Sequence, residues 1–263
     1  MLPGRPSAVP IARTDVRIRR GRALQPQLGC SHLAPFATMY RQVSMEVRES
    51  CDADRYGNPP YVAHLDSVFS TLYFHALDSW RFGQPQRCAA GVADRVLGRP
   101  EPACQHLGDM LLGMNAHISR DLPFALASVG PRLPDGRSAI PDVVAVNKDI
   151  FRAEAPLLAT IRVAYDPTTG QPPTLPKWLS PNKVPQIIAA WRLEAITNAK
   201  DLIDARSAAA RAQVETRIDD TATLRSLLIY KATVLKQPGA YNARRNAYCA
   251  IHASAADLDA PTQ

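Results

Sequence analysis

The densest set of residues able to do chemistry lies in one segment, Gly113–Pro123. His117 and Asp121 are four residues apart, so on a helix their side chains project from one face about one turn apart. A carboxylate beside an imidazole can fix the tautomer of the ring for general acid–base catalysis. The same pair can supply two ligands to one divalent metal ion, or form a buried structural hydrogen bond. The spacing leaves these three interpretations open.

Asn115 is the third candidate catalytic residue of this segment. On a regular helix it lies roughly 160° from His117, so it joins the same site only where the helix is distorted. His106 falls on nearly the same face as His117 and Asp121, within an arc of roughly 80°. This arc borders the apolar stripe of the helix, and we therefore expect it to face the interior of the protein.

Further polar residues can converge on the pair, and we predict that they bind substrate. Asp66 and Tyr73 lie at the edge of the apolar face of a helix expected over about 61–80, where Asp66 can also be a partly exposed acid. Asp142 and Asn147 flank a run of valines. Asp142 is also well placed to cap a helix N-terminus, whereas Asn147 needs a buried partner among the valines.

Apolar residues recur at helical spacing along most of the chain, and no segment alternates like a strand. The expected helices start near Pro35 and cover about 61–80, 103–121, 142–165, 186–206 and 219–236, with a short one near 88–97. Pro123 should kink or end the third of these. The pattern predicts an all-α fold, a single-domain bundle of about six or seven helices over residues 35–253.

The two ends of the chain lack such a pattern. Residues 1–34 are rich in arginine and proline and are predicted to be a poorly ordered extension, and residues 254–263 a frayed tail. The arginines contribute much of the net charge of +7 and could contact nucleic acid. Only 6% of the residues are aromatic, without the arrangement of a base-stacking platform, so a nucleic-acid partner is not expected.

Cysteine usage and hydropathy suggest the compartment. The chain has five cysteines, an odd number, and no C-x-x-C pair, which favours reduced structural thiols over a disulfide framework or a zinc ribbon. No stretch approaches the roughly 20 apolar residues of a membrane span, and the N-terminus lacks the apolar run of a secretory signal. We therefore expect no membrane span and a cytoplasmic protein.

Three blocks of the sequence resemble a family found in bacteria and fungi, domain-of-unknown-function family 5995. They are Phe36–Tyr40, His64–Tyr73 and Gly113–Pro123, the last followed by Asp142 and Val146–Asn147. The resemblance covers about 36–235 and implies a helical fold, but it supplies no reaction. It implies a polar site built on Asp66, Asn115, His117, Asp121, Asp142 and Asn147.

A fainter similarity links His117-x-x-x-Asp121 to the helical zinc-dependent phospholipases C and related nucleases. The Pro-x-His that follows in those enzymes is absent here, as is their dense set of further ligands. Motifs of other enzyme classes are also absent: G-x-S-x-G, the P-loop, H-E-x-x-H and the dinucleotide fingerprint. His64 and His75 share a face turned away from the apolar stripe and are expected to meet solvent.

The leading hypothesis is a small-molecule enzyme, of hydrolase or cyclase/isomerase type, with a polar pocket inside the bundle. His117 is its general acid or base, or a ligand of a divalent metal together with Asp121, which otherwise orients the ring. Asn115 and the polar residues on neighbouring helices position a small-molecule ligand. The alternative is a non-catalytic binding or scaffold protein in which the same residues form a buried hydrogen-bond network. The sequence does not determine the oligomeric state.

Overall fold

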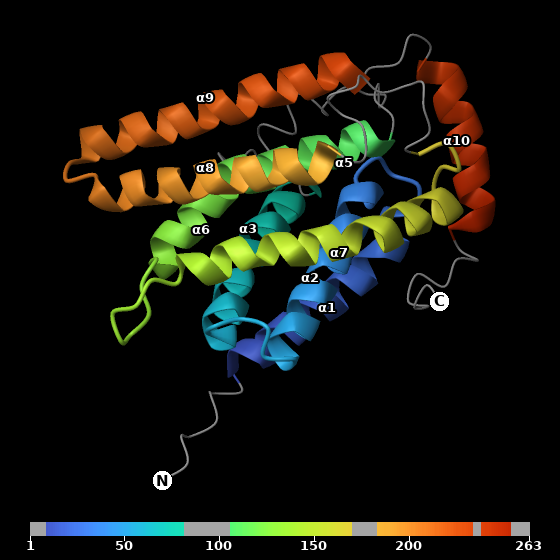
Figure 1. Ribbon diagram of the computed structural model, residues 1–263. Helices are drawn as coiled ribbons and strands as arrows, with labels where there is room; N and C mark the ends of the chain where they lie inside the picture. The colour runs from blue at the N-terminus through green and yellow to red at the C-terminus, as the bar shows by residue number, and fades with distance from the viewer. Residues whose placement is uncertain (1–8, 82–105, 170–182, 234–237, 254–263) are drawn as a thin grey trace.

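The apolar stripes become helices throughout the part of the chain that the computed structural model describes, residues 9–81, 106–169, 183–233 and 238–253 (Figure 1). These helices are α1 (Val9–Leu28), α2 (Ala34–Asp52), α3 (Pro59–Arg81), α5 (His106–Asn115), the π-helix η1 (Ala116–Asp121), α6 (Leu122–Val129), α7 (Ile140–Ala164), α8 (Val184–Asp204), α9 (Ala208–Thr233) and α10 (Pro238–His252). Within those ranges no strand occurs, which confirms the predicted all-α, single-domain fold. The expected short helix near 88–97 and the tail 254–263 lie outside the described residues.

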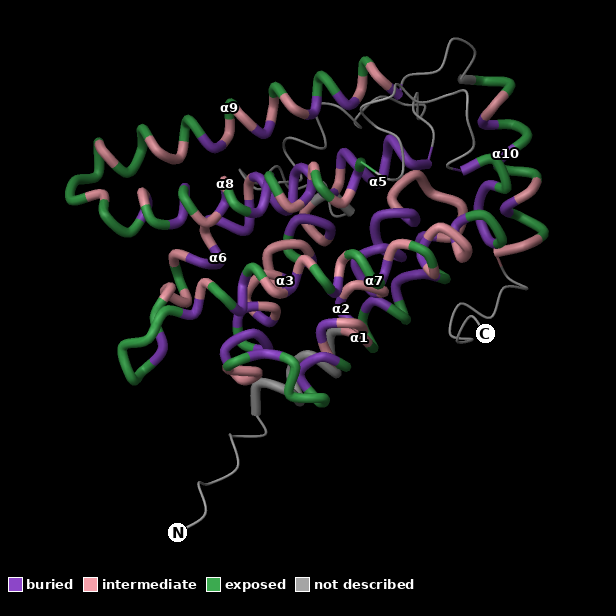
Figure 2. Tube along the Cα trace, viewed as in Figure 1, coloured by how far each residue is buried: buried purple, intermediate pink, exposed green. Residues whose placement is uncertain are grey.

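The segment α5–η1–α6 forms one continuous rod through the middle of the molecule (Figure 1). Helices α2 and α3 contact it from one side, and α8 and α9 contact it from the other. Buried positions follow this rod along its length, whereas α9 turns an exposed face outward (Figure 2). α7 packs on α2 and α8, and α1 covers α2 and α3. The rod is thus enclosed by helices, and its polar side chains must find partners inside the protein.

The sequence predicts that Pro123 kinks or ends its helix. The chain instead continues as a helix past Pro123, because the turn before it widens. The N–H of Leu122 donates to the carbonyl of His117, five residues earlier, which is the bond of a π-helix. In a regular α-helix the Pro123 ring would collide with the carbonyl of Ser119. Pro123 also has no N–H to donate to that carbonyl. The widened turn η1 relieves this conflict and lets the chain continue as α6. It also carries His117 and Asp121.

The expected poorly ordered extension over residues 1–34 is wrong for α1. Leu24 and Leu28 of this helix are buried, and the Gln25 side chain donates to Thr38 Oγ1 on α2 at 3.0 Å. Arg20 pairs with Asp78 on α3 at 2.6 Å. The apolar stripe of α1 is short and interrupted by arginines, with Pro26 inside the helix, and for this reason its helical pattern is weak in the sequence.

The expectation that the cysteines are reduced is wrong for two of them. Cys30, after α1, forms a disulfide with Cys249 on α10, 219 residues away in sequence. Spacing rules detect only cysteines that are close along the chain, so they could not reveal this pair. Cys51 is a free, buried thiol, as expected, and burial raises its pKa to about 12. Cys88 and Cys104 lie outside the described residues.

Packing of α1 can be tested with a single truncation. Leu24 is only 6% exposed, so Leu24→Ala should lower the free energy of unfolding by roughly 2–5 kcal/mol. Arg19 on the same helix is exposed, and Arg19→Ala should change the free energy of unfolding by less than about 0.5 kcal/mol. Urea denaturation of both variants measures the difference. Equal, negligible effects would mean that α1 does not pack on the domain.

Candidate functional site

His117 and Asp121 form a buried hydrogen-bonded pair on η1. His117 Nδ1 lies 3.0 Å from Asp121 Oδ2, and the two residues are only 4% and 3% exposed. A carboxylate accepts hydrogen bonds and does not donate them, so Nδ1 carries the proton of the neutral imidazole. Nε2 then carries the lone pair. This nitrogen is buried and has no hydrogen-bond partner among the described residues.

Aromatic rings hold the imidazole in place. The Phe69 ring on α3 stacks on His117 with ring centroids 3.6 Å apart and planes 9° apart. Tyr40 on α2 meets the imidazole edge-on at 5.1 Å. With one nitrogen tied to Asp121 and one face covered by Phe69, the ring has a fixed orientation, as a group that transfers protons requires.

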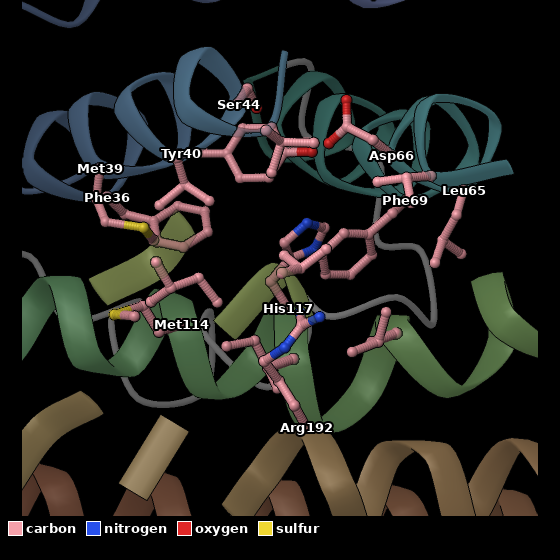
Figure 3. Close-up of a pocket in the computed structure, with 17 residues that line it drawn as sticks. Phe36, Met39, Tyr40, Ser44, Leu65, Asp66, Phe69, Met114, His117 and Arg192 are labelled. Carbon is pink, nitrogen blue, oxygen red and sulfur yellow. The ribbon is translucent and has the colours of Figure 1, made fainter. Parts of the chain in front are cut away.

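A mainly apolar cavity lies against the His117 ring (Figure 3). Water-sized molecules can occupy about 70 Å³ of it, more than the roughly 10–15 Å³ that one water needs. Its apolar wall comes from α2, α3, the rod and α7, and its polar lining includes Ser44, Asp66, His117 and Arg192. In Figure 3 Asp66 lies toward α3 and Arg192 toward α8, with the imidazole between them.

Burial lowers the pKa of His117 below its ordinary value, although the hydrogen bond and charge of Asp121 act in the opposite direction. Desolvation penalises the charged ring more than one carboxylate favours it. The imidazole is therefore neutral at physiological pH, and Nε2 is available as a base or as a hydrogen-bond acceptor.

Of the predicted substrate-binding residues, Asp66 alone lines this cavity. Tyr73 packs among rings, 5.1 Å from Tyr40 and 5.9 Å from His117. Asp142 accepts the backbone N–H groups of Gly57 and Asn58, each at 2.7 Å, and so anchors the turn before α3 to α7. Tyr73 and Asp142 are thus placed to support the site rather than to touch a ligand in the cavity.

Asn115, predicted to be catalytic, faces away from the cavity. Its amide nitrogen donates to the Ala222 carbonyl at 2.7 Å and to Ser226 Oγ at 2.9 Å, both on α9. Its oxygen accepts from Ser119 Oγ at 2.9 Å. The distortion of η1 begins after Asn115 and does not bring it round to His117. Its hydrogen bonds attach the rod to α9.

Arg192 on α8 is the charged residue of the cavity that the sequence analysis did not predict. Its guanidinium donates to Asn147 Oδ1 and to the Val143 carbonyl, each at 2.7 Å. The buried partner that Asn147 needs is therefore an arginine. The signal was present in the sequence, because Arg192 falls four residues after Ile188 on the apolar stripe of its helix, where a charge is costly.

The donor set around His117 does not make a metal site by itself. Among residues that the structure describes, no three His, Cys, Asp or Glu side chains are grouped so that they could hold one ion. Asp121 is hydrogen-bonded to the imidazole instead of lying beside it as a second ligand. His106 lies at the start of α5 with its ring 5.9 Å from Tyr165, and it does not line the cavity.

Comparison with known proteins places the chain in a family without assigning a reaction. The model of a family of unknown function, DUF5995, matches residues 17–232. The chain belongs to this family. No curated protein and no solved structure matches it. Among the described helices of this DUF5995 protein, none is both long and apolar enough to span a membrane.

The rod approaches α2 so closely that position 113 requires glycine. A Cβ at Gly113 would lie 2.5 Å from Phe36 Cγ, whereas a Cβ at Gly21 of α1 meets nothing closer than 3.6 Å. Gly113→Ala should push Phe36 toward the cavity it lines and lower the free energy of unfolding by roughly 1–3 kcal/mol.

The matched variant Gly21→Ala should be neutral or stabilising by up to about 1 kcal/mol, because alanine favours helix. Thermal and urea denaturation of the two variants provide the comparison. If Gly113→Ala proved as well tolerated as Gly21→Ala, the close contact between the rod and Phe36 would be disproved.

The lowered pKa of His117 predicts how stability depends on pH. The ring stays neutral in the folded protein while the unfolded chain takes up a proton near 6.5, so wild type loses the stabilisation by neutral His117 as the pH falls below that value. The stability difference between wild type and His117→Gln should therefore shrink from about pH 8 to about pH 5. Urea denaturation at several pH values measures it. A difference that stays constant would show that burial does not perturb the ring.

Proposed function

We propose that this protein is a proton-transfer enzyme of isomerase type that acts on a small apolar molecule. The observation that carries the proposal is the buried His117 Nε2, which has no partner among the described residues while Nδ1 is held by Asp121 beside the cavity. A buried acceptor without a partner is costly, which supports a role that a bound ligand completes.

In the proposed reaction His117 Nε2 removes a proton from a carbon next to a carbonyl group of the substrate. The ring becomes an imidazolium, which the Asp121 carboxylate stabilises through Nδ1. The ring then returns the proton to a different carbon, so that a double bond moves and no atom is gained or lost. A base with a pKa near or below the working pH suits both halves of this exchange.

The apolar wall favours isomerisation over hydrolysis. A hydrolase must hold a water molecule against the base with polar partners, whereas the cavity side of His117 is formed mainly by aromatic and aliphatic side chains. Proton transfer within one substrate needs no water, and a dry cavity strengthens the electrostatic effect of nearby charges.

The alternative is a binding or scaffold protein in which the pair is structural. The stacking of Phe69 on His117 favours it, because tight packing alone can account for a buried ring. The two functions differ in one respect: a scaffold has no use for the basicity of Nε2, and an isomerase depends on it.

The disulfide is informative about the cellular compartment in which the protein works. The sequence suggested the cytoplasm, but the Cys30–Cys249 bond supports an oxidising compartment, because cytoplasmic thiols are kept reduced. An enzyme working there would meet its substrate outside the reducing cytoplasm.

Hydrogen exchange into an apolar ketone tests the base directly. In heavy water the wild type should exchange the C–H groups next to the carbonyl of methyl octyl ketone, as followed by proton NMR. His117→Gln should lower the protein-dependent rate roughly a hundredfold or more, since glutamine is no base. His75→Gln, which changes an exposed histidine on α3, should leave it unchanged. Equal rates for wild type and His117→Gln would favour the binding protein.

A further inference from the structure

We propose that the substrate is an elongated apolar carboxylic acid whose carboxylate binds Arg192 and whose chain extends into a second cavity that adjoins the first. The inference deepens the proposed function and relies on it only for what His117 does to the bound acid. The binding itself depends on Arg192 and on the shape of the cavity, which can be tested without catalysis.

Arg192 is a buried cation that makes no direct ion pair with an acidic side chain in the described part of the chain, although the effect of burial, which lowers its pKa, is opposed by the nearby charge of Asp149, which raises it. It is 5% exposed, and its hydrogen bonds go to an amide oxygen and a backbone carbonyl, both neutral. The nearby carboxylate of Asp149 is already bound by Ser50, Tyr56 and Arg152. Burying a charge without a counter-ion is expensive, so a ligand anion at this position would complete the site.

The guanidinium retains donors for such an anion. The hydrogen bonds within the described protein use Nε and one hydrogen on Nη2, which leaves Nη1 and the second hydrogen of Nη2. Two neighbouring N–H groups on a planar guanidinium match the two oxygens of a carboxylate. A phosphate dianion would carry more charge than this one cation compensates, and we therefore assign the site to a carboxylate.

The charges of the cavity give the ligand a direction. Asp66 also lines the cavity, and it lies on the opposite side of His117 from Arg192 (Figure 3). A ligand carboxylate is attracted to the Arg192 side and repelled from the Asp66 side. The part of the ligand next to its carboxylate then lies against His117.

A second cavity adjoins the first. About 40 Å³ of it can be occupied by water-sized molecules, and Met39, Val43, Met114 and Ile150 line both it and the cavity at His117. Ile188, one turn before Arg192 on α8, is part of its wall. Apart from Glu154, which is half-buried, its lining is apolar. Movement of the flexible Met39 and Met114 side chains would join the two spaces into one that fits an unbranched hydrocarbon chain starting near Arg192.

Calorimetric titration with decanoate, decanol and butyrate tests both halves of the ligand. Decanoate should bind at least about tenfold more tightly than decanol, which has the same chain without the charge. It should also bind more tightly than butyrate, by about fourfold for each additional methylene that is buried. Equal affinities for decanoate and decanol would overturn the role of Arg192. Equal affinities for decanoate and butyrate would overturn the binding of the hydrocarbon chain in the second cavity.

An isosteric substitution tests Arg192 without removing it. Asn147→Asp keeps the acceptor for Arg192 Nε and supplies an internal counter-ion, so decanoate should bind at least about tenfold more weakly while decanol changes little. The matched control is Asn198→Asp, because Asn198 likewise accepts from an arginine, Arg217, but lies away from the cavity. It should leave both affinities unchanged.

A further variant keeps the test decisive. If Asn147→Asp does not fold, Arg192→Lys, which keeps the charge but loses the paired donors, should weaken decanoate binding and spare decanol. Unchanged decanoate binding by the variants that fold overturns the inference.

His117→Gln should still bind decanoate. Binding by this variant without ketone exchange by wild type would refute the proposed reaction alone. Ketone exchange by wild type without decanoate binding would refute an apolar carboxylic acid as the substrate but would still support the proposed proton transfer by His117.

Discussion

The enclosure of the α5–η1–α6 rod between two sets of helices is the constraint on which the rest of the structure depends. A rod buried on both sides must satisfy each polar side chain with a partner from the protein or from a ligand. On the α9 side this is achieved, because Asn115 bonds to Ala222, Ser226 and Ser119. On the α2 and α3 side His117 is hydrogen-bonded at Nδ1, and its Nε2 has no partner among the described residues. The two sides of the rod therefore differ in how completely their buried polar groups are hydrogen-bonded within the described part of the chain.

The same contrast holds for the charges around the cavity. Asp142 is fully used by the turn at Gly57 and Asn58, and Asp149 by three donors. Among the described residues Arg192 donates hydrogen bonds to neutral oxygens only, which fix its position without a direct ion pair. This arrangement is compatible with the carboxylate ligand proposed above, because a protein carboxylate bonded to Arg192 would compete with it.

The π-turn accounts for the position of the His117–Asp121 pair on the rod. Pro123 forces the preceding turn to widen, and the widened turn contains both His117 and Asp121. Widened turns of this kind are rare and occur often at functional sites. The Cys30–Cys249 disulfide joins the segment after α1 to α10, so two segments far apart in the sequence are covalently linked.

The sequence by itself determined the local structure and the central pair. The helices and the His117–Asp121 spacing depend on residues within a few turns of one another, and periodicity in the sequence reveals them directly. The family resemblance is likewise carried by short blocks of sequence. Periodicity fails at α1, because the apolar stripe of this packed helix is too short to be recognised in the sequence.

Only the tertiary structure decided which distant groups meet. The pairing of Asn147 with Arg192, 45 residues apart, and of Cys30 with Cys249, 219 residues apart, depends on how the helices pack. The helical position of Asn115, roughly 160° from His117, required a distorted helix to bring it into the site, and the structure instead turns it toward α9. Tyr73, predicted from the edge of its helical face, packs among aromatic rings. A helical face fixes the direction of a side chain relative to its own helix, and the neighbour it meets is set by contacts between helices far apart in the sequence.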